Sequence, residues 1–319
     1  MTTPASSNPS RTGKAASSAL SRSAHVDSFA RDNLPPREQW PELLLDRPEL
    51  RYPDRLNAAE ELLDRMVHSG HAERPVIHSE VDGKPVSCTY RQLLVRANQI
   101  AHVLQQDMGL VPGNRVLLRA PNNPMMAACW LAVIKAGCIA VATMPLLRAK
   151  ELSQVIDKAR ISAALCDVRL KDELLGAQAQ SQDLRKVLFF NDNSPGSLDS
   201  LLTRHDPHFD NVATAADDVA LIAFTSGTTG QPKGTMHFHR DVLAMCDLFP
   251  RHVLNMDAND IVCGTPPIAF TFGLGGLLAF PLRYGACAVL LEKYTPESLL
   301  RSEEHTSELQ SRETISYAV

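Results

Sequence analysis

The 319-residue sequence lacks the marks of a membrane protein or a nucleic-acid-binding protein. No apolar run approaches the length needed to cross a bilayer, so we expect a soluble protein. No basic stretch with interleaved aromatic residues occurs, and the formal net charge of -4 argues against a nucleic-acid partner. The N-terminal residues contain no apolar core of the kind that a secretory signal needs.

The seven cysteines form no CxxC pair. They lie far apart, mostly inside apolar segments, and their number is odd. This pattern favours reduced thiols in a core over disulfides or a zinc site. We therefore expect a cytoplasmic protein.

Residues 1–24 are rich in Ser, Ala and Thr and contain no Asp or Glu, while Arg11, Lys14 and Arg22 supply positive charge. This composition fits an organelle transit peptide, and it also fits a disordered tail. We favour the disordered tail and place the start of the folded part at residue 25.

Helix and strand patterns alternate from about Arg51 onward. Helices are predicted from Asn57 and Thr89, where capping residues precede apolar periodic runs, and over 125–135, 149–159, 239–249 and 274–282. Apolar strands are predicted over 138–143, 162–167, 187–190, 219–224, 261–263 and 286–291. The polar residues 191–218 are predicted to form a surface connection. The alternation predicts an α/β fold with layered, mostly parallel sheets and flanking helices.

The last nineteen residues interrupt this pattern. The stretch RSEEHTSELQS, Arg301–Ser311, matches the translation of a common sequencing-library adapter. We therefore expect residues 301–319 to be non-native and the genuine sequence to be cut off near Leu300. The alternative is a genuine polar C-terminal helix.

The stretch FTSGTTGQPKGT, Phe224–Thr235, directly follows the apolar run VALIAF. A strand that leads into a Gly/Ser/Thr loop and then a helix is a common way to bind phosphate, because glycines allow close backbone approach and hydroxyls donate hydrogen bonds. Lys233 would supply positive charge. The P-loop pattern is excluded by spacing, because Pro232 occupies its second glycine position and Lys233 precedes Gly234.

The motif TSGTTGQPKG closely resembles the phosphate-loop signature of the adenylate-forming superfamily, which includes acyl-CoA synthetases. The runs RVLLRAPNNP and AVIKAGCIAVATMPLLRAKEL are also similar to that family, so the resemblance covers roughly Leu56 to Leu300. It implies an incomplete large N-terminal domain over 25–300, with the small C-terminal domain absent. It also implies that ATP is bound by Thr225, Ser226, Gly227, Thr228, Thr229, Gly230, Lys233 and Gly234. Lys233 would be the catalytic residue, neutralising the leaving pyrophosphate together with Mg²⁺.

In the stretch PPIAFTFGLGG, Pro266–Gly276, Phe270 stands where many acyl-CoA synthetases have a histidine. A phenylalanine at this position is similar to benzoate-CoA ligases. The early segment AHVDSFARDNLPPREQWPEL looks most like 2-aminobenzoate-CoA ligases. The resemblance implies a small aromatic acid as substrate, coenzyme A as co-substrate, and an acid pocket at Phe270 and Gly273. Core packing is the alternative for Phe270, and we expect Phe272 to lie in the core.

Other parts that the family uses are missing. Tyr284-Gly285 continues as Ala-Cys instead of the aromatic-Gly-x-Thr-Glu motif, and no Gly-Asp dipeptide exists for the ribose-binding aspartate. We therefore expect this chain to be inactive. The alternative from another class is a non-catalytic nucleotide-binding or scaffold protein. His237 and His239 are expected to be structural, because a spacing of two does not put both on one helical face, and no metal ligands are predicted.

Overall fold

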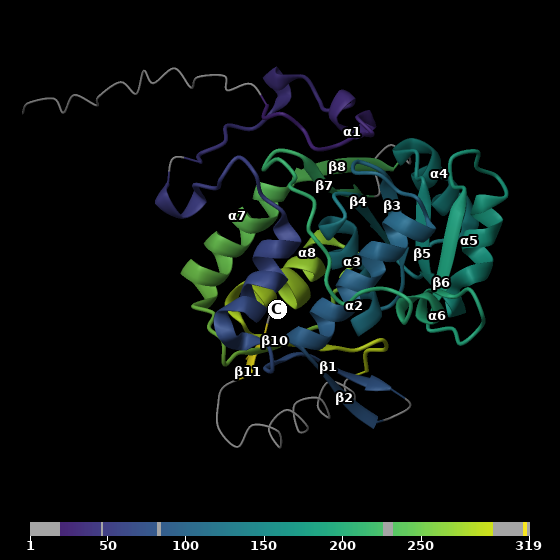
Figure 1. Ribbon diagram of the computed structural model, residues 1–319. Coiled ribbons are helices and arrows are strands. Elements are labelled where there is room, and N and C mark those ends of the chain that lie inside the picture. Colours follow the sequence, from purple (N-terminus) through teal and green to yellow (C-terminus); the bar gives the residue numbers. More distant parts are fainter. Residues whose placement is uncertain (1–19, 46, 82–83, 226–231, 296–314, 318–319) are drawn as a thin grey trace, which may run out of the picture.

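The computed structural model describes residues 20–45, 47–81, 84–225, 232–295 and 315–317. Two sheets lie one above the other, with helices between them and with α4 and α5 on the outer face of the six-stranded sheet (Figure 1). The strand orders are β6-β5-β3-β4-β7-β8 and β11-β9-β10-β1-β2. Neighbouring strands are parallel except in the hairpins β1–β2 and β7–β8, so the predicted mostly parallel α/β fold is confirmed.

The strands of the six-stranded sheet are β3 (Arg115–Arg119), β4 (Ile139–Thr143), β5 (Ala163–Asp167), β6 (Lys186–Phe190), β7 (Val219–Thr225) and β8 (Lys233–Phe238). Those of the five-stranded sheet are β1 (Pro75–Val81), β2 (Lys84–Thr89), β9 (Ile261–Cys263), β10 (Cys287–Leu290) and β11 (Ile315–Tyr317). The α-helices are α1 (Phe29–Asp32), α2 (Tyr90–His102), α3 (Pro124–Lys135), α4 (Ala149–Ala159), α5 (Lys171–Gln178), α6 (Leu198–Leu202), α7 (His239–Phe249), α8 (Thr271–Leu274) and α9 (Phe280–Tyr284). Further helical turns span Arg37–Gln39, Pro48–Leu50, Glu60–Asp64, Val67–His71, Val103–Asp107, Val168–Leu170, Pro250–Leu254 and Gly275–Ala279.

The six-stranded sheet is buried on both faces. In β3, Val116 and Leu118 belong to the core between the two sheets, while Leu117 belongs to a second core beneath α4 and α5. Successive side chains of a strand point to opposite faces, so a strand covered on both sides must be apolar at every position. This explains why the central strands read as unbroken apolar runs.

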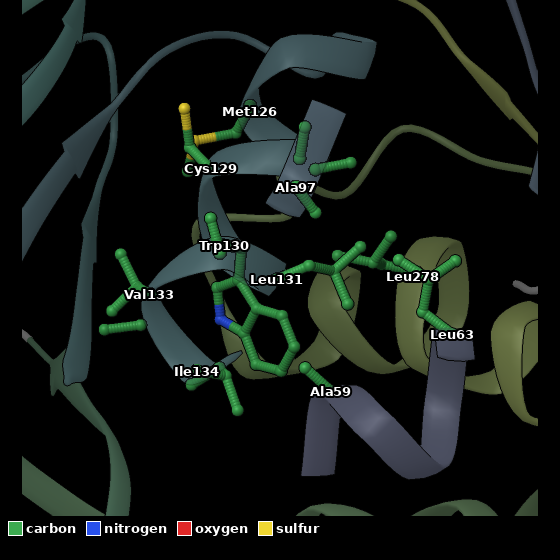
Figure 2. Close-up of a cluster of buried hydrophobic side chains, with 14 of the residues drawn as sticks. Ala59, Leu63, Ala97, Met126, Cys129, Trp130, Leu131, Val133, Ile134 and Leu278 are labelled. Carbon is green, nitrogen blue, oxygen red and sulfur yellow. The ribbon is translucent and has the colours of Figure 1, made fainter. Parts of the chain in front are cut away.

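Helix α3 fills the space between the sheets (Figure 2). Its N-terminus is capped by the side chain of Asn123, which accepts a hydrogen bond from the amide of Met126 at 2.9 Å, and Pro124 occupies the first turn. Gly137 follows the helix with a φ of +66°, a conformation that favours glycine. These signals predict the helix from sequence, and its burial on all sides agrees with its almost wholly apolar composition.

Several elements differ from the prediction. The bounds of α4, α7 and β9 match it, but the hairpin β1–β2 and helix α5 have no predicted counterpart, and the helix predicted over 274–282 begins earlier, at Thr271. The segment 191–218 is more than a surface connection, because α6 lies within it and Leu198 is completely buried. Short elements of this kind carry too few residues to establish a period.

Residues 20–33 form an N-terminal strap across the start of β7. The amide of Ser21 donates to Asp217 at 3.0 Å, and the amide of Ala24 donates to Asp218 at 2.9 Å. Arg31 pairs with the same Asp218 at 3.1 Å. Residues 20–24 of the predicted tail therefore contact the folded part, while residues 1–19 lie outside the described residues.

The C-terminal residues are described only in part. The predicted non-native segment 301–319 lies outside the described residues except for β11, which pairs in parallel with β9. All seven cysteines are free, as predicted, and five of them are buried. Within the described ranges, no helix has both the length and the apolar character to span a bilayer.

Candidate active site

The predicted phosphate loop joins two antiparallel strands. Thr225 at the end of β7 pairs with Lys233 at the start of β8, and Phe224 pairs with Gly234. The helix α7 begins at His239 as predicted, but strand β8, which was not predicted, lies between the loop and this helix. Ser226, Gly227, Thr228, Thr229 and Gly230 lie outside the described residues, so their predicted contacts with ATP stay predictions.

Lys233 projects from the first position of β8. Its side chain is exposed and has no hydrogen bond or ion pair with any residue that the structure describes. Thr225 beside it is also exposed. As far as the described residues show, the cation and the neighbouring hydroxyl are therefore accessible to a ligand.

Gly234 is required by packing inside the hairpin. A Cβ atom there would lie 2.9 Å from Cγ2 of Ile222 and 3.2 Å from the ring of Phe224. The cross-strand partner therefore closes over the glycine. This structural role is separate from the predicted role in ATP binding.

The second group of predicted residues lies in a turn after β9. The amide of Phe270 donates to the carbonyl of Pro267 at 3.0 Å, and Phe270 directly precedes α8. A Cβ atom on Gly273 would lie 2.1 Å from the same Pro267 oxygen, so only glycine fits there. Phe270 is 40% exposed, and Phe272 is 61% exposed, which corrects the expectation that Phe272 lies in the core. Phe272, the second residue of α8, therefore points its side chain away from the protein.

Asn122 connects this turn to the six-stranded sheet. Its Nδ2 donates to the carbonyl of Pro266 at 3.0 Å, and its Oδ1 accepts from the amide of Ile268 at 2.8 Å. The sequence analysis missed this residue. Its only local signal is its place between β3 and the cap of α3, because its partners are 144 and 146 positions away.

The predicted phosphate loop and the turn that carries Phe270 share one edge of the molecule. Strands β3, β4 and β7 are parallel neighbours, so Asn122 and the predicted phosphate loop both follow the carboxyl ends of strands in the same sheet. Strands β3 and β7 are two strands apart, or about 10 Å. The crevice outside the carboxyl ends of parallel strands is where open α/β sheets bind ligands. No hydrogen bond or ring contact links Lys233 to Phe270 within the described residues.

An ionic network reinforces this edge. The completely buried Asp167 ends β5 and pairs with Arg169, which also binds Glu292 after β10 at 2.6 Å. Burial alone would raise the pKa of Asp167, but the hydrogen bonds from Arg169 and Asn191 outweigh it and lower the pKa. The same Arg169 contacts lower the pKa of Glu292 against its burial. Both carboxylates are therefore held ionised and tie the two sheets together.

His239 is the first residue of α7 and is completely buried. Its Nδ1 accepts from the amide of Ala58, and burial lowers its pKa to about 3. His237 lies in β8, and burial lowers its pKa as well. No group of three or more potential metal-ligating side chains occurs within the described ranges.

Known proteins were compared with this chain. Residues 65–307 match the AMP-binding enzyme family. The chain is 29% identical to benzoate–CoA ligase of Thauera aromatica over 79% of its own length and 47% of the relative. It is 30% identical to anthranilate–CoA ligase of Pseudomonas aeruginosa over 66% of its length and 40% of the relative.

Solved structures show the same fold. The anthranilate CoA ligase AuaEII in complex with anthranoyl-AMP superposes with a TM-score of 0.71 at 22% identity, covering 78% of this chain and 46% of that protein. ATP-bound MatB from Rhodopseudomonas palustris superposes with a TM-score of 0.69 at 24% identity, covering 82% of this chain and 49% of that protein. The chain thus spans about half the length of these proteins. It belongs to the AMP-binding, adenylate-forming enzyme family, whose members include the acyl-CoA ligases.

Proposed function

We propose that the chain is the ATP- and acid-binding part of an AMP-forming aryl-acid:CoA ligase. The observation that carries this proposal is Lys233, which is exposed beside the signature loop and has no ion pair with the residues that the structure describes, at the same sheet edge as the Phe270 turn. The substrates would be ATP, a small aromatic carboxylic acid and coenzyme A.

The reaction would have two steps. The substrate carboxylate attacks the α-phosphorus of ATP, so an acyl-adenylate forms and pyrophosphate leaves. The thiol of coenzyme A then attacks the acyl carbon, so a thioester forms and AMP leaves. In the first step, negative charge grows on the pyrophosphate, and the ammonium of Lys233 with donors from Thr225 to Gly234 would stabilise that charge.

Phe270 would form one wall of the acid pocket. Its ring is apolar and 40% exposed, so it has surface left to cover an aromatic substrate. Gly273 would act indirectly, because the close approach of α8 to Pro267 sets where that ring lies.

Magnesium is implied by the family. The described residues offer no carboxylate and histidine cluster that would hold it by themselves. ATP carries its own oxygen ligands for Mg²⁺. A magnesium ion would therefore enter with the nucleotide, and we assign it no step.

We also propose that these 319 residues bind ATP but do not complete adenylation, because they contain neither the aromatic-Gly-x-Thr-Glu motif nor a Gly-Asp dipeptide. Exchange of pyrophosphate into ATP by this chain, driven by benzoate or 2-aminobenzoate, would contradict this. The seven free thiols support a reducing compartment such as the cytoplasm.

Calorimetric titration with ATP tests the role of Lys233. Lys233→Ala is expected to weaken ATP binding by about tenfold, because it removes a charge-assisted contact of roughly 1.5 kcal/mol. Lys150→Ala is the matched control, because Lys150 is equally exposed but lies at the start of α4. Equal affinities in all three proteins would separate the loop from phosphate binding, whether the protein is an enzyme or a nucleotide-binding scaffold.

A further inference from the structure

The turn that carries Phe270 has a single side chain holding two adjacent backbone groups. Asn122 donates to the carbonyl of Pro266 at 3.0 Å and accepts from the amide of Ile268 at 2.8 Å. Its Nδ2 also contacts the hydroxyl of Tyr294. Asn122 is 4% exposed, so water has little access to replace these bonds.

The turn transmits any displacement to Phe270. Pro267 lies between the two groups that Asn122 holds, and its carbonyl accepts from the amide of Phe270 at 3.0 Å. The same carbonyl lies against Gly273, where an added Cβ would be only 2.1 Å away. Backbone is therefore packed on backbone, and a shift of the turn moves both Phe270 and the start of α8.

Asn122 is itself held firmly. The next residue, Asn123, caps α3 through the amide of Met126 and donates to Glu292 at 2.9 Å. Glu292 is paired with Arg169, which anchors it to the end of β5. The hydrogen bonds from Asn122 to the turn, here called the clamp, are therefore supported by a buried helix and a sheet edge rather than by another loop.

We propose that Asn122 is a positioning residue that fixes the Pro266–Phe270 turn and thereby sets the affinity for the aryl acid. This inference rests on the proposed function of Phe270. An amide is required because it presents one donor and one acceptor side by side, whereas a carboxylate only accepts. Asn122→Asp would keep the bond from Ile268 but lose the bond to Pro266, and Asn122→Leu would lose both.

The experiment compares Asn122→Leu and Asn122→Asp with the control Asn98→Leu, because Asn98 is equally buried but donates to the carbonyl of Pro207 instead of to the turn. The affinity for 2-aminobenzoate and for ATP is measured by titration of the full chain. The fluorine NMR signal of 4-fluorophenylalanine at position 270 reports the turn, and hydrogen exchange reports the Ile268 amide.

Both Asn122 variants are expected to weaken 2-aminobenzoate binding by about tenfold, to shift the fluorine signal and to leave ATP affinity within twofold. Exchange of the Ile268 amide should accelerate at least tenfold in Asn122→Leu and remain slow in Asn122→Asp. Asn98→Leu should change none of these. If Asn122→Leu does not fold, Asn122→Asp still decides the matter through acid affinity and the fluorine signal.

An unchanged acid affinity with an unchanged fluorine signal in either Asn122 variant would overturn the inference. Equal losses of acid and ATP affinity would also overturn it, because they would indicate general loosening. If the unmodified chain binds ATP but no aryl acid, the proposed acid pocket is refuted. A fluorine shift in the Asn122 variants would then show that Asn122 positions the turn, but its role in acid affinity would be refuted. A failure of the Asn122 hydrogen bonds to hold the turn is a separate outcome, because the Ile268 amide would then exchange at the same rate in all the proteins.

Discussion

The imidazole of His239 accepts a hydrogen bond from the amide of Ala58 through Nδ1, at 3.1 Å. The bond assigns the ring proton to Nε2, which is buried without a hydrogen-bond partner among the described residues. This hydrogen bond therefore connects the start of α7, which directly follows β8, to the helical segment that contains Ala58. Protonation of Nδ1 would break the hydrogen bond.

The free energy of unfolding is expected to fall with pH below neutrality. Burial, together with the nearby His25, lowers the pKa of His239 from its ordinary value of 6.5 to about 3. Between these values the unfolded chain binds a proton that the folded chain does not, so acid favours unfolding. From pH 7.5 to pH 5, His239 alone would remove roughly 2 kcal/mol.

His239→Asn tests this. The asparagine oxygen retains an acceptor near Nδ1 but does not titrate. Urea unfolding at pH 7.5 and pH 5 should show a smaller difference in the variant by about 2 kcal/mol. The buried carboxylates of Asp167 and Asp218 have lowered pKa values, so their contribution is lost only below their ordinary value of 3.8. An identical pH dependence in both proteins would refute the role of His239.

The buried pair of Lys135 and Asp64 is a second sensitive point. The Nζ atom of Lys135 lies 2.6 and 2.5 Å from the two oxygens of Asp64, and Lys135 is completely buried. Burial lowers the pKa of Lys135 against the effect of Asp64. Lys135→Met leaves a buried carboxylate without its cation, which is expected to cost about 3–5 kcal/mol of unfolding free energy.

A second substitution distinguishes an unpaired charge from lost packing. Adding Asp64→Asn to Lys135→Met removes the charge and still leaves an acceptor for Asn211, which donates to Asp64 at 3.0 Å. Chemical denaturation should find the double variant more stable than Lys135→Met alone. Arg65→Met is the exposed control and should cost no more than about 0.5 kcal/mol. A double variant as unstable as the single would point to packing instead.

Two glycines of the same stretch are expected to respond oppositely to alanine. Gly273→Ala would place a Cβ 2.1 Å from the Pro267 oxygen, whereas a Cβ on Gly276 meets nothing within 4 Å. We expect Gly273→Ala to lower the unfolding free energy by about 2 kcal/mol or more. Gly276→Ala should be neutral or stabilising by up to about 1 kcal/mol, because it lies in a helical segment. Thermal and urea unfolding measure both, and equal effects would contradict the close approach.

Two phenylalanines of this stretch offer a matched pair for acid binding. Phe270→Ala is expected to weaken 2-aminobenzoate binding by roughly tenfold, because burial of part of an aromatic ring is worth about 1.5 kcal/mol. Phe272→Ala should leave that affinity within about twofold. Both side chains are substantially exposed, so neither change should alter stability by more than about 1 kcal/mol. Equal effects on acid affinity would remove Phe270 from the pocket.

Much of the fold is readable from the sequence where signals are local. Asn123, Pro124 and Gly137 bracket α3 within one stretch, and apolar runs mark strands buried on both faces. Strand β8 carries no such signal, because KGTMHF contains glycine and lysine and does not alternate clearly. Its strand conformation depends on pairing with β7, which is a tertiary contact.

The candidate site divides in the same way. The loop signature is contiguous and could be recognised, whereas the packing that requires glycine at position 273 could not. The exposure of Phe272 and the clamp of Asn122 depend on how the turn after β9 meets the end of β3. No periodicity reports a contact between residues 144 positions apart.

The N-terminal strap carries a consequence for the order of events during synthesis. Asp217, the partner of Ser21, is synthesised 196 residues after it, and Asp218 follows its partner Arg31 by 187 residues. At ribosomal rates of about 5–20 residues per second, that interval is roughly 10–40 s. The earliest described residues to leave the ribosome therefore reach their native contacts only after β3, β4, β5 and β6 have been synthesised.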